Sequence, residues 1–305
     1  METSGAQLSR WRQFLFWALV VVWFSEMLLW GLRSLAEGWG TSIWLVPTPE
    51  DPELATALYM TRAFHAPDKA ALGVLAVFAL RSRDAFARTA LFASMALVPP
   101  LNVAFQFRAQ GFPVQPTMIG TTLSILLWVS FFLFPERSVQ PKQNEGRTSS
   151  RWDRFRYTWF SLYAVVLTAL GLLSLFAPRT HLALTFPCSE GLLAAHEAQL
   201  SPLVISDMGI GTHLMALGVA MWFATVRGST NRTLRHAATS SAIVHTGLIC
   251  ALPLRLIAVE LGGRCAASSI AIVFLPLLVG WLVYAAIEFT EVFHHGQNRA
   301  RKASA

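Results

Sequence analysis

The side chains best suited to chemistry in this chain are titratable groups inside long apolar segments. His213 and His245 are the clearest pair, since each interrupts a run of apolar residues. A charged group costs roughly 2.5–3.5 kcal/mol at the centre of a bilayer on insertion scales, so groups of this kind usually mark functional sites. Further polar residues in comparable segments are candidates for the same site, namely Asp68, Asp207, Glu26 and Asn102.

The two histidines share a helical environment and an expected depth. In helical phase, His213 lies on one face with Gly209 and Ala216, and His245 lies on one face with Ser241. Small residues let membrane helices approach closely, so both imidazoles are expected in the interior, facing a shared cavity. This geometry allows haem coordination by two imidazoles, a proton relay, or a hydrogen bond to a polar ligand headgroup. Alternatively, each imidazole satisfies only a nearby backbone or hydroxyl group.

The two aspartates have a second interpretation as helix caps. Pro67 precedes Asp68, and proline is favoured in the first turn of a helix, where an acidic side chain also interacts well with the helix dipole. Ser206 precedes Asp207 and is a good N-cap residue. If helices began at these points, the two carboxylates would be capping groups at a water-exposed vestibule.

Composition indicates whether these segments fold in water or in a lipid bilayer. Apolar residues make up 54% of the 305-residue chain and charged residues 13%, and the mean hydropathy is +0.48. A spanning helix needs roughly 20 mainly apolar residues. The sequence therefore predicts an all-α integral membrane protein with eight transmembrane helices, at about 13–32, 60–80, 88–107, 114–134, 156–177, 205–225, 236–257 and 267–289.

Basic residues predict the orientation of these helices. Most of the 24 Lys and Arg residues fall at the two termini or in the loops after the second, fourth and sixth segments. The positive-inside rule places these regions, and hence both termini, in the cytoplasm. The net charge of +7 then reflects topology and contact with anionic lipid headgroups, not nucleic-acid binding. We expect a protein of the plasma membrane or inner membrane.

The chain carries signs of an internal duplication. Ser9–Phe14 resembles Ser150–Phe155, and Ala71–Val74 is repeated at Ala216–Val219. The similar offsets predict two four-helix repeats with the same orientation, related by a pseudo-two-fold axis along the membrane normal. The expected units are a first repeat at 1–135, a cytoplasmic linker at 136–150, a second repeat at 151–293 and a basic tail at 294–305.

Two cysteines fall in loops expected outside the cytoplasm. Cys188 follows the fifth segment and Cys265 follows the seventh. Thiols on that side are exposed to oxidising conditions, so a disulfide between them is predicted, with two unpaired thiols as the alternative. Cys250 lies inside the seventh segment and is expected to pack as a small apolar residue.

The function expected from these features is binding or transport of a lipophilic or amphipathic small molecule between the two halves. The candidate ligand contacts are His213, His245, Asp68, Asp207, Glu26 and Asn102. One alternative is a membrane enzyme or a haem-type electron carrier that uses the His213/His245 pair. Another is a scaffold subunit of a larger membrane complex, with a membrane protein as its partner. The chain lacks a phosphate-binding loop, a Cys-x-x-Cys pair and a zinc-protease motif, and no metal site is expected.

Overall fold

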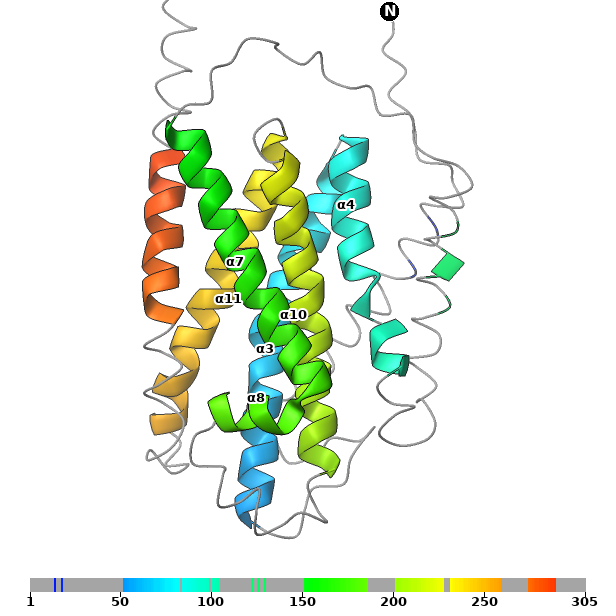
Figure 1. Cartoon of the computed structure of the whole chain (residues 1–305), viewed down its shortest axis with the longest axis vertical. Coiled ribbons are helices and arrows are strands. Elements are labelled where there is room, and N and C mark those ends of the chain that lie inside the picture. Colours follow the sequence, from blue (N-terminus) through cyan, green and yellow to red (C-terminus); the bar gives the residue numbers. More distant parts are fainter. Residues whose placement is uncertain are drawn as a thin grey trace, which may run out of the picture.

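The computed structural model describes residues 52–82, 84–98, 100–104, 151–185, 201–227, 231–258 and 274–288, with a few isolated positions. Regular secondary structure within these ranges is helical (Figure 1). The labelled helices are α3 (Pro52–Arg81), α4 (Ala85–Met95), α7 (Arg151–Phe176), α8 (Pro178–Thr185), α10 (Ser201–Arg227) and α11 (Arg232–Ala258). An apolar helix at Phe274–Glu288 follows them.

Among the described residues, three helices are long and apolar enough to cross a membrane. They are Phe86–Ala104, Arg154–Phe176 and Ser206–Arg227. These match the third, fifth and sixth expected segments, which confirms the all-helical class and supports a membrane protein. The described helices also overlap the second, seventh and eighth segments. The segments at 13–32 and 114–134 lie outside the described residues except at isolated positions, so the eight-helix duplication stays a prediction.

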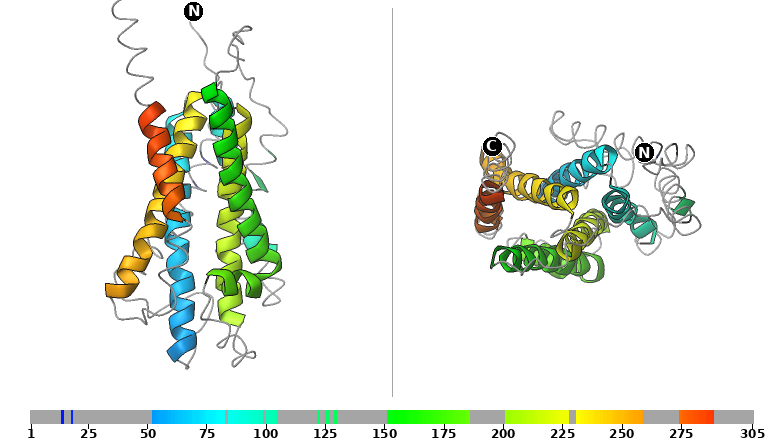
Figure 2. Two further views of the ribbon diagram at one scale, coloured as in Figure 1. Left: turned by 60° about the vertical axis from the view of Figure 1, so that its left-hand side comes forward. Right: turned by 90° about the horizontal axis from the view of Figure 1, so that it is seen from above.

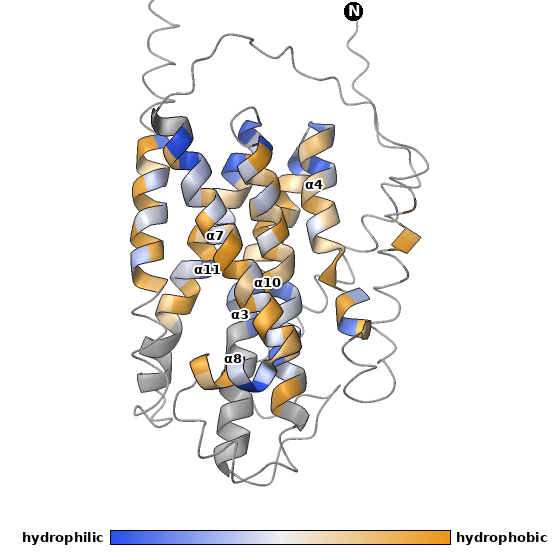
Figure 3. Cartoon of the chain, in the orientation of Figure 1, coloured by the Kyte–Doolittle hydropathy of each residue, from blue (hydrophilic) through white to orange (hydrophobic). Residues whose placement is uncertain are grey.

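The helices are rich in hydrophobic residues (Figure 3), and several large apolar side chains on them are exposed. On α7, Leu162 is 48% exposed and Phe176 is 65% exposed, and on the last helix Leu282 is 49% exposed. Large apolar patches of this kind are rare on soluble monomers and mark membrane or protein contacts. The bundle therefore has an exterior suited to hydrocarbon.

The long helices pack as two pairs. Figure 2 shows α7 beside α10 and α3 beside α11, and α10 also packs against α3 and α4. Small residues allow the closest approach, because a Cβ placed on Gly211 would lie 3.0 Å from the carbonyl oxygen of Gly171 and 2.7 Å from Ser174 Oγ. This is the small-residue packing typical of membrane helices.

Charged residues gather at the end of the bundle where α3 finishes and α4, α7 and α11 begin (Figure 3). The turn between α3 and α4 is closed by Asp84, whose Oδ1 accepts a hydrogen bond from the backbone N–H of Ala87 at 2.6 Å. Across this end, Arg235 Nε donates to Glu288 Oε1 at 2.9 Å. The cap starts α4, and the ion pair joins α11 to the last helix.

An aromatic cluster packs α7 against the last helix. Trp281 is fully buried and lies edge-on to Tyr163 and Phe160, with ring centroids 5.2 Å and 5.1 Å away. Tyr284 extends the cluster at 5.5 Å from Phe160. Such edge-to-face pairs add about 0.5–1.5 kcal/mol beyond their buried area. The cluster fixes the ring of Tyr163 at the centre of the bundle.

Candidate functional site

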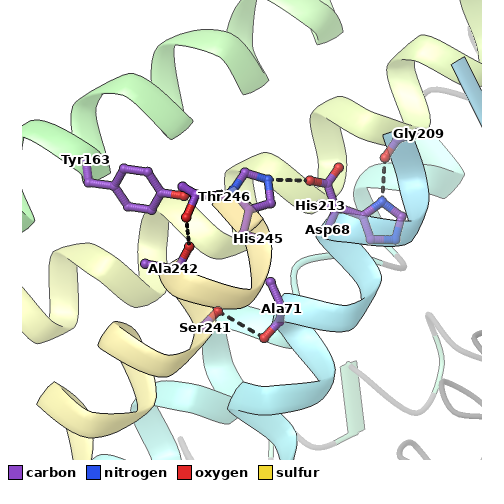
Figure 4. Close-up of polar contacts among 9 residues, drawn as sticks. All are labelled: Asp68, Ala71, Tyr163, Gly209, His213, Ser241, Ala242, His245 and Thr246. Atoms are coloured by element: carbon purple, nitrogen blue, oxygen red, sulfur yellow. Dashed lines mark hydrogen bonds and ion pairs between the residues drawn. The ribbon is translucent and has the colours of Figure 1, made fainter. Parts of the chain in front are cut away.

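Three helices bring polar side chains to one buried point, which we call the central triad: Asp68 on α3, His245 on α11 and Tyr163 on α7 (Figure 4). His245 Nε2 lies 2.8 Å from Asp68 Oδ1, and the Tyr163 hydroxyl lies 2.7 Å from His245 Nδ1. The three residues are only 1–2% exposed. Asp68 is 13 residues from Arg81 at the basic end of α3, which is about 20 Å at 1.5 Å per residue. The triad therefore lies deep in the bundle.

The hydrogen bonds of the triad define a proton arrangement. A neutral imidazole has one N–H group and one acceptor nitrogen. With Asp68 as a carboxylate, His245 Nε2 donates to it and Nδ1 accepts from the Tyr163 hydroxyl. A carboxylate that orients an imidazole in this way is a common arrangement for acid–base chemistry.

The surroundings of the triad hold α11 against α3. One turn away, Ser241 Oγ donates to the carbonyl oxygen of Ala71 on α3 at 3.0 Å (Figure 4). The His245 ring also packs edge-on against Phe274, with centroids 6.0 Å apart. These contacts restrict the imidazole from several sides, so the Asp68–His245 geometry is built into the helix packing.

One oxygen of Asp68 lies outside this hydrogen-bond pattern. Oδ2 is buried and has no hydrogen-bond partner in the part of the chain that the structure describes. Leaving a buried polar group unsatisfied costs about 1–3 kcal/mol, and more when it is charged. An acceptor of this kind is suited to a bound donor, a water molecule or a proton.

A second carboxylate–imidazole pair lies nearer the end where α7 finishes. His181 on α8 has its Nδ1 2.8 Å from Asp207 Oδ1 on α10, and the two residues are 3% and 0% exposed. Ser174 Oγ on α7 donates to the backbone oxygen of Asp207 at 2.6 Å. The short helix α8 crosses the long helices (Figure 1) and is held to them by this buried pair.

The third polar group surrounds His213 on α10. Its Nδ1–H donates to the carbonyl oxygen of Gly209 at 2.6 Å (Figure 4), and its ring lies edge-on to His65 of α3 at 5.5 Å. His65 Nε2 in turn donates to the carbonyl oxygen of Ser206 at 2.9 Å. Glycine at position 209 allows this approach, because a Cβ there would lie 2.7 Å from His65 Cε1 and the imidazole would have to move.

Asn102 joins the same region. Its Oδ1 accepts a hydrogen bond from Thr212 Oγ1 at 2.9 Å, next to His213 in the chain. The structure thus brings Asp68 together with His245, and Asn102 close to His213. It gives His213 and His245 different immediate partners, and the expectation that both line one cavity stays a prediction.

The capping interpretation of the aspartates is wrong. α3 begins at Pro52 and has Pro67 inside it, and α10 begins at Ser201. Asp68 and Asp207 are therefore internal to their helices and bond to imidazoles instead of helix N-termini. Among the other expected residues, Glu26, Cys188 and Cys265 lie outside the described residues, and Cys250 is a partly buried free thiol on α11.

Neither a metal site nor haem coordination is built into the described residues. No group of three or more His, Cys, Asp or Glu side chains among them could hold a metal ion. Both ring nitrogens of His245 are within hydrogen-bond distance of Tyr163 or Asp68. Haem iron would have to displace one of these partners, so the present arrangement of His245 does not fit bis-imidazole coordination.

Two site residues were missed from the sequence. Tyr163 falls in a long apolar segment, where tyrosine is an ordinary core residue, and nothing local indicates its partner on α11. His181 lies beyond the expected fifth segment at 156–177, although Pro178 could have indicated a helix start just before it.

Comparison with known proteins found no match. No protein-family model, no curated protein and no solved structure matches this chain.

Proposed function

We propose that this protein is a multipass membrane protein that binds or transports a lipophilic or amphipathic small molecule inside its helical bundle. The observation that carries this proposal is the central triad, in which Asp68, His245 and Tyr163 from three helices are joined by hydrogen bonds of 2.7–2.8 Å deep in an apolar bundle. Burying these groups is costly. Their convergence at one point is typical of a binding site.

The chemistry of the triad supports a ligand with one polar group. Asp68 Oδ2 is a buried acceptor without a partner among the described residues, so it is suited to a hydroxyl or amine donor on the ligand. The apolar remainder of an amphipathic molecule would lie against apolar side chains beside the triad, such as Phe274, whose ring packs against His245. A polar anchor in an apolar site is the usual composition of a small-molecule pocket.

We also propose the parallel arrangement of two four-helix repeats. In the register set by Ala71–Val74 and Ala216–Val219, α3 corresponds to α10 and α4 to α11. The corresponding helix pairs α11–α3 and α4–α10 each carry a polar contact between the two halves. His245–Asp68 links α11 to α3, and Asn102–Thr212 links the helical segment after α4 to α10. Matching contacts of this kind support a duplication in which each half acquired different polar groups.

The proposed orientation places the charged end of the bundle in the cytoplasm, together with both termini. The ends of the described helices there carry Arg81, Arg154, Arg227, Arg232 and Arg235. Basic residues near helix ends favour the cytoplasmic side and attract anionic lipid headgroups. The α8 end then faces the outside of a plasma or inner membrane.

A second candidate function is acid–base chemistry on a lipid. Its support is the pairing of His245 with a carboxylate, which orients the imidazole and would stabilise its protonated form. Turnover of a bound lipid by purified protein, lost in His245→Gln, would favour this function over binding and transport.

The proposal is tested by identifying what purifies with the protein. Full-length wild type, Asp68→Asn and His245→Leu would be purified in detergent, and the bound small molecules would be extracted and measured by mass spectrometry. Ser94→Ala is the matched control, because Ser94 is a buried polar residue on α4 that bonds only its own helix, at Ala90, in the described contacts.

We expect one molecule to be retained by the wild type and by Ser94→Ala, and to be largely lost from both triad variants. Melting temperatures measured on the same samples separate loss of the ligand from loss of the fold. Equal retention by all four proteins, or no retained molecule other than bulk lipid, would contradict the proposal.

A further inference from the structure

We propose that the two carboxylate–imidazole pairs form a proton pathway from the α8 end of the bundle to the central triad. The pathway comprises His181, Asp207, Asp68, His245 and Tyr163, all of which are at most 3% exposed. Each of these side chains can gain or lose a proton, and four of them are paired at 2.8 Å. This activity goes beyond ligand binding, although it uses the same Asp68 Oδ2 atom that the ligand would contact.

The two pairs lie at neighbouring levels of the bundle. Ser206, which precedes Asp207 on α10, accepts the hydrogen bond of His65 on α3. Asp68 follows His65 by three residues, which is about 4.5 Å along a helix axis. His181 also interacts electrostatically with Asp68. The outer pair is therefore close enough to influence the carboxylate of the inner pair.

The proton enters beside α8. Arg179 and Thr180 on this helix are exposed, while His181 on the same helix points into the protein and is held at Nδ1 by Asp207. A proton that reaches His181 converts it to an imidazolium, which the Asp207 carboxylate stabilises. The exposed residues of α8 thus lie beside the buried His181, which begins the pathway.

The transfer to the triad is a single proton exchange. The N–H bond at His181 Nε2 breaks and an O–H bond forms at Asp68 Oδ2, which returns His181 to its neutral form and neutralises the Asp68 carboxylate. A water molecule bound at Asp68 Oδ2 can carry this proton, because this oxygen is buried and has no hydrogen-bond partner among the described residues. The Oδ1 atom keeps its bond to His245 throughout, so the triad stores one proton.

Other titratable groups also interact with the pathway. Among the described residues, Lys69 on α3 acts on Asp68, and Cys250 on α11 acts on Tyr163.

The experiment follows the protonation of Asp68 by infrared spectroscopy after a rapid drop in pH. Full-length protein in lipid vesicles is used, and the carboxyl band of Asp68 is identified by its loss in Asp68→Asn. The rate at which this band changes is then compared between wild type, His181→Gln and Asp207→Asn. Thr225→Val is the control, because Thr225 is a buried hydroxyl on α10 that bonds Met221 of its own helix.

We expect the band to rise about 100-fold more slowly in His181→Gln and Asp207→Asn, since a positioned proton-transfer group typically contributes 10²–10⁴-fold in rate. The rate in Thr225→Val should equal that of the wild type. Both relay substitutions keep hydrogen-bonding side chains, and if one variant does not fold, the other is decisive. Unchanged rates in the folded variants, or no carboxyl band that disappears in Asp68→Asn, would overturn the pathway. Neither result depends on the retained ligand.

Discussion

Removing the hydroxyl of Tyr163 tests the energetic role of the central triad. Tyr163→Phe deletes one buried hydrogen bond of 2.7 Å and leaves His245 Nδ1 without that partner. A buried group left unsatisfied costs about 1–3 kcal/mol. The aromatic ring is unchanged and keeps its contact with Trp281, so little packing energy is lost. We therefore expect the free energy of unfolding to fall by about 2 kcal/mol.

The measurement is reversible unfolding in mixed detergent micelles, with Tyr157→Phe as the matched control. Tyr157 lies on the same helix and is 58% exposed, so its change should stay within about 0.5 kcal/mol. A double-mutant cycle of Tyr163→Phe with His245→Gln should give a coupling energy of about 0.5–3 kcal/mol, as for other residues in contact. If Tyr163→Phe were as mild as the control and the coupling were zero, the hydrogen bond would contribute nothing and the triad would lose its energetic basis.

Two further predictions concern other parts of the chain. Gly209→Ala should destabilise the protein by about 1–3 kcal/mol through overpacking against His65. Gly247→Ala is the control and should be neutral or slightly stabilising, because its Cβ would meet its nearest neighbour at 3.8 Å. The same unfolding assay measures both variants. Cys188 and Cys265 should form a disulfide that raises the free energy of unfolding by about 3–4 kcal/mol. Mass mapping under non-reducing conditions would exclude the disulfide by finding both thiols unmodified.

The helices could be predicted from the sequence because their signal is local. The expected segments at 205–225 and 236–257 fall within α10 (Ser201–Arg227) and α11 (Arg232–Ala258), which begin four residues earlier and end one or two residues later. Hydropathy detects the apolar centre of a helix, while the polar ends continue the same backbone hydrogen bonds without contributing to the signal. The short helix α8 was missed because its eight residues are too few for a spanning segment.

The interior residues could be predicted more readily than their partners. Helical phase placed His213 and His245 in the interior, and both are at least 95% buried. Phase describes one helix at a time, however, and the hydrogen bonds of His245 depend on how α11 meets α3 and α7. The expectation of a cavity shared by His213 and His245 also depended on their equal depth in the membrane. Equal depth does not determine which neighbouring helix each imidazole faces.

The distribution of polarity among the helices follows from the same contacts. α3 and α11 have 30 and 27 residues, enough to cross a bilayer, yet they are not among the three helices apolar enough to do so on composition alone. Their polar residues meet each other inside the bundle, through His245–Asp68 and through Ser241–Ala71. In hydrocarbon these groups must be satisfied by protein. α3 and α11 can therefore be polar because they pair with each other, while α7 supplies Tyr163 and presents its apolar side outward.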